Sequence, residues 1–244
     1  MNVLDLFSGI GGFSLGLERA GFDTVAFCEI NPFCRAVLKK HWPDVPCFDD
    51  IRALSAETLS ANGVGAVDLI CGGFPCQDIS PAGSGRGLEG DRSGLWFEFR
   101  RLVEEVSPNW GIIENSSRLR SLGLEIILGQ LDALGYDAEW HCIPASAVGA
   151  PHQRDRLWVI AHSQRLGLSG QGQLVTSINP TPQAYREANR LINAFRRRCL
   201  PFVCGGHDGL PTCVDEPSVN ASGNAVVPPI PEMLGKAIKQ RLAA

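Results

Sequence analysis

The sequence contains no run of about 18–20 apolar residues, the length that a helix needs to span a bilayer. Its N-terminus lacks the basic flank of a signal peptide, and Asp5 interrupts the first apolar run. From these two absences we expect a cytoplasmic protein with no membrane segment. With 244 residues, of which 44% are hydrophobic, the chain is long enough for one sizeable core, or for one domain with a small appendage.

The nine cysteines include no CxxC pair. An odd number of cysteines, in a chain that lacks a secretory signal, favours reduced thiols over disulfides. Cys199, Cys204, His207 and Cys213 form one loose cluster, but their spacing matches no common zinc site. We therefore predict that the protein binds no metal.

The chain also has no excess of positive charge, since its formal net charge is −4. This charge argues against a protein that coats nucleic acid. Positive charge is nevertheless concentrated locally. Eight arginines and no lysines lie between Arg154 and Arg198, against only Asp155 and Glu187. Such a segment could face phosphate, or it could be an ordinary solvated helix surface, and charge alone does not decide between them.

Short apolar runs alternate with helical patterns along the first two thirds of the chain. Strand-like runs occupy 2–7, 23–30, 67–73, 110–115, 137–143 and 156–162, and helical patterns occupy 11–22, 31–41, 95–106 and 124–135. This alternation is typical of an α/β protein with a doubly wound, mostly parallel sheet.

The character of the sequence changes after His162. The next residues are rich in Gly, Ser and Gln, and 184–198 has the pattern of a basic amphipathic helix. A closing helix is predicted at 229–242. We therefore predict a main domain formed by 1–162 and 214–244, with a short inserted region at 163–213.

The stretch DLFSGIGG, residues 5–12, follows the first predicted strand and opens the first helix. Glycines there let a ligand approach the backbone, and the helix N-terminus offers free N–H groups. Glu29 ends the second strand, twenty residues after Gly9, where nucleotide-binding folds place an acid on ribose hydroxyls. Such turns can serve packing alone, but the combination favours a cofactor that contains adenosine. Asp50 could accept a hydrogen bond from the adenine ring, or it could simply stabilise a turn.

Cys76 follows one predicted strand and Glu114 lies at the end of another, at the edge where doubly wound sheets hold their ligands. Cys76 could be a nucleophile, since a thiolate is strongly nucleophilic, or an ordinary packed cysteine. Glu114 follows apolar residues, so desolvation is expected to raise its pKa, although it could equally cap the next helix. Arg154 and Arg156 lie on one side of a strand, where they could bind an anion, hold Glu114 or pair on the surface.

Seven blocks of the sequence occur together in one order: DLFSGIGG (5–12), Glu29, DDI (49–51), GGFPCQ (72–77), ENS (114–116), RDR (154–156) and GNAVVP (223–228). In this combination the chain resembles the DNA (cytosine-5)-methyltransferases, over about 1–162 and 215–244. It departs from the family's usual pattern at Ser116, at His152 and in the stretch before the last block. The short inserted region resembles that of a compact, phage- or prophage-like member.

The resemblance implies a Rossmann-like domain that binds S-adenosylmethionine, releases S-adenosylhomocysteine and methylates C5 of cytosine in double-stranded DNA. It implies that Cys76 adds to C6 of a cytosine flipped out of the duplex. Glu114 would protonate or hydrogen-bond N3 of the ring, and Arg154 and Arg156 would hold the base and Glu114. The inserted region 163–213 would recognise the target sequence. DNA methylation, as in restriction–modification systems, is the expected process, and a monomer the expected form.

The resemblance also implies which residues contact the cofactor and the DNA. The expected cofactor contacts are Phe7, Ser8, Gly9, Ile10, Gly11, Gly12, Glu29, Ile30, Asp50, Ile51, Gly73, Pro75, Leu95, Asn224, Ala225 and Val226. The expected DNA contacts are Gln77, Ser80, Arg86, Arg92, Arg186, Arg190, Arg196, Arg197 and Arg198.

Three alternatives stay open at this point. A nicotinamide-dependent oxidoreductase would also use a Gly-rich turn and an acid after the second strand, but it gives no role to the Pro-Cys-Gln stretch at 75–77. A non-enzymatic descendant of the family would bind duplex DNA without forming a covalent adduct. The third is an RNA methyltransferase, since one subfamily of this fold modifies transfer RNA.

Overall fold

A computed structural model describes residues 1–75, 94–150, 153–175 and 225–243. The strands in these residues are β1 (Asn2–Leu6), β2 (Asp23–Cys28), β3 (Cys47–Phe48), β4 (Leu69–Gly72), β5 (Trp110–Ser116), β6 (Tyr136–Pro144) and β7 (Asp155–Ser163). The α-helices are α1 (Gly12–Arg19), α2 (Pro32–His41), α3 (Ala56–Ala61), α4 (Leu95–Val106), α5 (Leu119–Leu122), α6 (Leu124–Ala133) and α9 (Pro229–Ala243). Two 3₁₀ turns are η2 (Ala145–Val148) and η3 (Gln164–Leu166).

The strands form a seven-stranded sheet in the order β3-β2-β1-β4-β5-β7-β6. The first five in this order are parallel, whereas β7 runs antiparallel to both β5 and β6. The predicted doubly wound, mostly parallel sheet is therefore confirmed. Because parallel strands end at a common edge, the residues that follow β1, β2, β3, β4 and β5 are brought to one side of the molecule.

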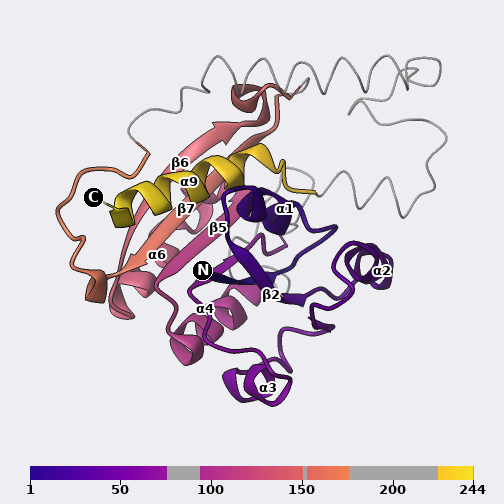
Figure 1. The fold of residues 1–244 in the computed structure, drawn as a ribbon. Helices are drawn as coiled ribbons and strands as arrows, with labels where there is room; N and C mark the ends of the chain where they lie inside the picture. Colours follow the sequence, from indigo (N-terminus) through magenta and orange to yellow (C-terminus); the bar gives the residue numbers. More distant parts are fainter. Residues whose placement is uncertain (76–93, 151–152, 176–224, 244) are drawn as a thin grey trace, which may run out of the picture.

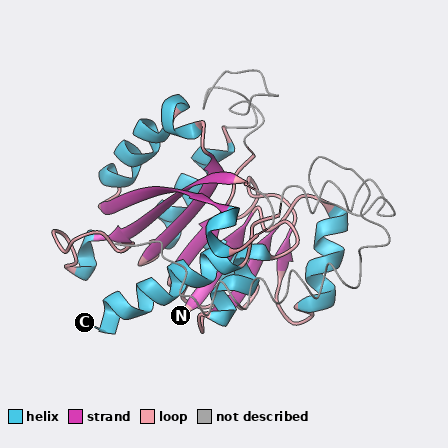
Figure 2. Ribbon diagram, turned by 90° about the horizontal axis from the view of Figure 1, so that it is seen from above, coloured by secondary structure: helices cyan, strands magenta, loops and turns pink. Residues whose placement is uncertain are grey.

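Helices cover both faces of the sheet (Figures 1 and 2). On one face α1 and α9 pack side by side, burying Phe13 and Leu17 of α1 with Leu234 and Ile238 of α9. On the other face α4 and α6 contribute apolar residues such as Trp96, Phe99, Leu102 and Ile127. Within the described residues, no helix combines the length and the apolar character that crossing a membrane requires.

The predicted helix at 31–41 shows how local sequence sets a boundary. Asn31 accepts a hydrogen bond at Oδ1 from the N–H of Phe33 at 2.9 Å, and Pro32 occupies the first turn. Both features were expected from the sequence. In contrast, β3 and α3 were missed, because β3 has only two residues and α3 only six, too few to show a period.

The described cysteines are free thiols, as the sequence predicts. Burial raises the pKa of Cys28 to about 12, so this thiol stays un-ionised and acts as an apolar packing group. Cys71 is also buried, whereas Cys142 is exposed. The loose cluster of Cys199, Cys204, His207 and Cys213 lies outside the described residues.

Residues 163–175, which the sequence assigns to the inserted region, contact the main domain. Gln164 donates from Nε2 to Asp137 at 3.0 Å, and the N–H of Leu174 donates to Glu139 at 2.8 Å. Arg241 of α9 donates to the carbonyl oxygens of residues 171 and 172. The boundary at 163 stays a prediction, and these contacts show that residues 163–175 pack on the main domain. The basic helix predicted at 184–198 lies outside the described residues.

Two glycines on α1 allow the C-terminal segment to pack against the start of the chain. A Cβ placed on Gly12 would lie 2.5 Å from the carbonyl oxygen of Val226. A Cβ on Gly16 would lie 2.7 Å from Cγ of Pro231 and closer still to the carbonyl oxygen of Pro228. Because Gly12 and Gly16 are one helical turn apart, they form a smooth surface on α1 that lets the backbone of the C-terminal segment approach closely. This contact carries the segment before α9 to the N-terminus of α1.

We predict that Gly16→Ala destabilises the protein by about 1–3 kcal/mol, because the added methyl overlaps backbone atoms that cannot move freely. The control is Gly129→Ala in α6, where an added Cβ meets no atom within 4 Å. That change should stabilise the protein by about 1 kcal/mol through helix propensity. Urea unfolding measures both. A stabilised Gly16→Ala variant would contradict the close packing.

Candidate active site

The turn between β1 and α1 has an unusual backbone. Phe7, Gly9 and Gly11 all have positive φ angles, of 53°, 53° and 85°. Ser8 stabilises the turn because its Oγ donates to the carbonyl oxygen of Asp5 at 2.6 Å. A positive φ is uncommon for a residue with a side chain, so Phe7 is held in this conformation by its surroundings. Ser8 is buried, and Phe7 packs against the core.

Glu29 connects this turn to the end of β2. Its Oε2 accepts from the N–H of Gly9 at 2.7 Å, and its Oε1 accepts from the N–H of Asn31 at 2.7 Å. The carboxylate therefore lies between the glycine turn and the start of α2. No atom of the described residues lies within 4 Å of the position that a Cβ on Gly9 would take, so this part of the chain leaves the space in front of Gly9 open. Ile30, which follows Glu29 in the chain, has 64% of its surface exposed.

The Trp42 side chain packs against the turn between β1 and α1. Its indole N–H donates to Glu18 at 2.7 Å, and its ring packs edge-on against Phe27. A Cβ on Gly11 would lie 2.6 Å from the Trp42 ring. Glycine is therefore required at position 11 for two reasons: the backbone there has a positive φ, and a Cβ would collide with the indole ring.

The residues after β3 occupy different environments. Asp50 accepts at Oδ1 from both the backbone N–H and Nε of Arg52, each at 3.0 Å, and these hydrogen bonds lower the pKa of Asp50. Ile51 is only 4% exposed and packs in the core. Of the two isoleucines expected to contact the cofactor, Ile30 therefore offers an exposed apolar surface, whereas Ile51 lies in the core.

Glu114 lies near the carboxyl end of β5 and is almost completely buried. Its Oε1 is 2.8 Å from Nε of Arg156, with which it forms an ion pair. Burial raises the pKa of Glu114, whereas the charges of Arg156 and Arg154 and the hydrogen bond from Arg156 oppose the rise. The expectation that desolvation raises this pKa agrees with this environment.

The antiparallel pairing of β5 with β7 places the two partners of this ion pair next to each other. Glu114 is opposite Trp158, and Ser116 is opposite Arg156, so Glu114 and Arg156 project from the same face of the sheet. Arg154 precedes β7 and acts on Glu114 through its charge. The structure therefore brings together Glu114, Arg154 and Arg156, as the sequence predicts.

Gly73 and Asn115 position the chain that leads to Cys76. A Cβ on Gly73 would lie 2.7 Å from Oε2 of Glu114, so only glycine lets the carboxylate approach β4 this closely. The buried side chain of Asn115 donates from Nδ2 to the carbonyl oxygen of Phe74 at 3.0 Å. Sequence reasoning assigned no role to Asn115, although its polar side chain within an apolar strand was a signal.

The remaining expected contacts fall into two groups. Pro75, Ala225 and Val226 are described, and Leu95 begins α4 and packs against the core. The other group lies outside the described residues: Cys76, Gln77, Ser80, Arg86, Arg92, Arg186, Arg190, Arg196, Arg197, Arg198 and Asn224. Their roles stay predictions.

Comparison with known proteins connects this site to one protein family. The family model of the C-5 cytosine-specific DNA methylases matches residues 1–197. The chain belongs to this family. A nicotinamide-dependent oxidoreductase is thereby excluded, and the predicted family and Rossmann-like fold are confirmed.

Three similar proteins illustrate the relationship. The Type II methyltransferase M2.BsuMI of Bacillus subtilis is 32% identical over 232 residues, which are 86% of this chain and 58% of that protein. The Type II methyltransferase M.CviJI of Paramecium bursaria Chlorella virus IL3A is 37% identical over 65% of this chain and 42% of its own length. A crystal structure of a candidate DNA modification methyltransferase encoded within an E. coli prophage is 31% identical, with a TM-score of 0.57. That match covers 68% of this chain and 48% of the other. The chain thus spans about half the length of these relatives.

Asp5 is a second buried carboxyl group near the glycine turn. Its Oδ2 accepts from Oγ of Ser14 at 2.7 Å and from the N–H of Ser14 at 3.3 Å, which joins β1 to the first turn of α1. Its Oδ1 has no hydrogen-bond partner among the described residues. Burial raises the pKa of Asp5 to about 7, the hydrogen bonds from Ser14 oppose this rise, and the charge of Glu29 adds to it.

We predict that Asp5 makes the protein less stable as the pH rises. Between its ordinary pKa of 3.8 and about 7, the folded protein holds a proton that the unfolded chain has released, so raising the pH through this range favours unfolding. The difference corresponds to about 4 kcal/mol. Asp5→Asn, which stays neutral, should remove this pH dependence and be the more stable form at pH 8.

Urea unfolding at pH 5 and pH 8 measures the effect. Asp23→Asn is the control, because the side chain of Asp23 is 78% exposed. The same pH profile in wild type and Asp5→Asn would show that Asp5 is ionised in the folded protein throughout this range.

Proposed function

We propose that this protein transfers a methyl group from S-adenosylmethionine to C5 of cytosine in double-stranded DNA, through a covalent Cys76–C6 intermediate with the target base flipped out. The observation that carries the proposal is the buried ion pair between Glu114 and Arg156, 2.8 Å apart, at the sheet edge where β4 leads toward Cys76. A buried acid held beside a strand end that continues to a cysteine fits acid-assisted nucleophilic attack on a pyrimidine.

The residues around the glycine turn fit an adenosine-containing cofactor. The open space in front of Gly9 would let the ligand approach the backbone. Glu29 is held by two backbone N–H groups, and a carboxylate so placed can still accept from ribose hydroxyls through its remaining lone pairs. Ile30 offers an exposed apolar surface for the adenine ring. When bound, S-adenosylmethionine supplies an electrophilic methyl group on a sulfonium.

Cys76 overcomes the weak nucleophilicity of C5 in cytosine. Its thiolate forms a bond to C6, and the electrons of the C5–C6 double bond shift so that C5 becomes a nucleophilic enamine carbon. C5 would then take the methyl group as the methyl–sulfur bond breaks, with S-adenosylhomocysteine as the leaving group. Loss of the C5 proton to a base and expulsion of the Cys76 thiolate restore the aromatic ring. The covalent route divides one difficult step into two easier ones.

Glu114 supports the attack by donating a proton or a hydrogen bond to N3 of the cytosine. Burial favours the protonated form of the group that this role requires, and this is the physical reason for its raised pKa. Arg156 holds the carboxyl group in place, and Arg154 and Arg156 would also contact the flipped base. The duplex hides C6 of a stacked cytosine, so the base must leave the stack, at a cost of a few kcal/mol.

DNA recognition is assigned to the inserted region. Its arginines at 186, 190 and 196–198 would contact phosphates and so position the duplex, whereas contacts with base edges would select the sequence. In this proposal the main domain comprises 1–162 and 214–244, with residues 163–175 packed on it as described above.

Replacing Cys76 by serine tests the proposed chemistry. Incubation of duplex DNA with tritiated S-adenosylmethionine should place label on C5 of cytosine, and Cys76→Ser should abolish this transfer while the cofactor still binds. Cys142→Ser is the control, because Cys142 is an exposed thiol on β6, the edge strand of the sheet, and has no role in the proposed chemistry. Label on adenine, or greater turnover on RNA than on duplex DNA, would refute the proposed substrate.

We predict that Gly73→Ala lowers the rate of methyl transfer by about 100-fold, because the added methyl displaces the Glu114 carboxylate from its position beside β4. Gly65→Ala, at a position where an added Cβ meets no atom within 4 Å, should keep the wild-type rate. The urea midpoints of both variants should stay close to wild type. Full activity of Gly73→Ala would show that this carboxylate position is not needed.

A further inference from the structure

Two arginines next to the proposed active site differ from the other described arginines. Arg118 and Arg120 are exposed, and in the described part of the chain neither side chain has an ion pair or hydrogen-bond partner. Elsewhere the guanidinium groups are engaged. Arg101, for example, pairs with both Glu98 and Glu105, and Arg165 donates to a backbone carbonyl oxygen.

The fold fixes where these two arginines lie. They belong to the turn and short helix α5 that follow β5 directly, so they lie at the same sheet edge as Glu114. Leu119, between them, is fully buried in the core and anchors α5. The residues on either side of it are exposed.

Arg118 and Arg120 place positive charge close to Glu114, although the protein as a whole carries a net negative charge. The carboxylate of Glu114 already has an ion-pair partner in Arg156. Arg118 and Arg120 therefore contribute charge that no described acid compensates. A guanidinium presents a planar pair of N–H donors that matches the oxygens of a phosphate.

We propose that Arg118 and Arg120 bind backbone phosphates of double-stranded DNA beside the flipped cytosine, as a contact surface separate from the inserted region. This inference rests on the proposed function, because it takes duplex DNA as the ligand at this edge. The contacts hold the duplex over Glu114 while the base leaves the stack. They carry no sequence information, since phosphates are the same at every position.

The experiment measures binding of duplex DNA at 50, 100 and 200 mM salt. Each phosphate contact contributes about 0.9 to the slope of log affinity against log salt, so Arg118→Gln/Arg120→Gln should lower the slope by about 1.8. Between 50 and 200 mM salt the wild type should therefore lose about 12-fold more affinity than this variant. Arg118→Lys/Arg120→Lys should keep most of the wild-type slope, and S-adenosylmethionine affinity should stay unchanged in both.

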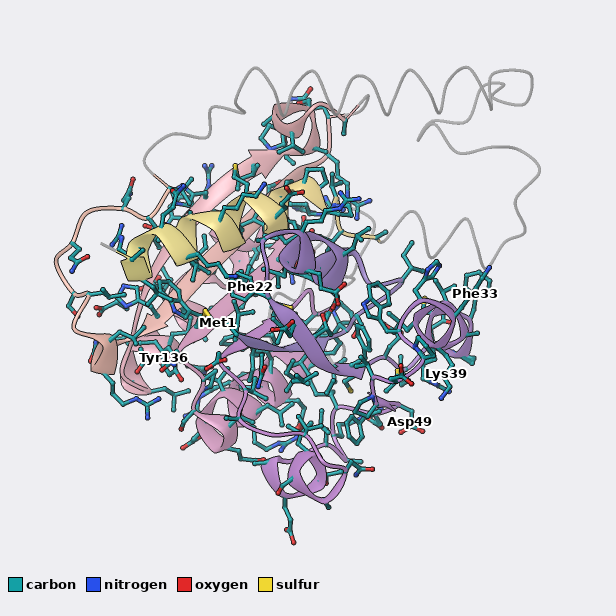
Figure 3. All side chains as sticks on the ribbon, in the orientation of Figure 1. Met1, Phe22, Phe33, Lys39, Asp49 and Tyr136 are labelled. Carbon is teal, nitrogen blue, oxygen red and sulfur yellow. The ribbon has the colours of Figure 1, made fainter. Side chains whose placement is uncertain are left out.

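Lys39→Gln/Lys40→Gln is the matched control. These lysines are exposed and lie in the last turn of α2, on the opposite side of β1 and β4 from β5 in the strand order. Figure 3 shows Lys39 on this helix. The control removes the same charge and should keep the wild-type slope.

Three outcomes would overturn the inference: an unchanged slope in Arg118→Gln/Arg120→Gln, an equal reduction in the lysine control, or a wild type that does not bind duplex DNA. Failure of the proposed function is a separate result. It would appear as salt-dependent binding of DNA without formation of methylcytosine, and the slopes would still decide the role of the two arginines.

Discussion

The ion pair between Glu114 and Arg156 depends on the way the sheet is built, and the proposed chemistry depends on the ion pair. A carboxylate buried at the end of a strand is unfavourable unless a charge and hydrogen bonds compensate for its lost hydration. The compensation comes from β7, which runs antiparallel beside β5 and thereby presents Arg156 on the same face as Glu114.

The surroundings of the pair are equally specific. Gly73 lets the carboxylate approach β4, and Asn115 fixes the carbonyl group of Phe74 on the path to Cys76. Adjacent parallel strands thus hold an acid and the chain leading to the proposed nucleophile in a fixed relation. This rigidity is what a covalent mechanism requires, because small displacements of reacting groups are costly.

The proposed cofactor side of the site depends on backbone more than on side chains. Glu29 holds the N–H of Gly9, Trp42 packs against Gly11, and the segment at Val226 passes over Gly12. Each contact uses a glycine where a Cβ would collide or where φ is positive. As a result, the beginning and the end of the chain meet at the N-terminus of α1, and the C-terminal segment becomes part of the same site.

The sequence by itself determined the alternation of strands and helices, the glycine turn, and the placement of Glu29 and Glu114 at strand ends, because these follow from local patterns and from the common edge of parallel strands. It also gave the family, through blocks that occur in one order. The short elements β3 and α3, the antiparallel direction of β7, and the burial of Ile51 against the exposure of Ile30 were decided only by tertiary structure. Tertiary structure also decided the raised pKa of Asp5, because that shift comes from burial. It likewise decided that the exposed side chains of Arg118 and Arg120 have no partner among the described residues. The physical reason is that burial, pairing and charge compensation are set by residues distant in the sequence, and no local period records them.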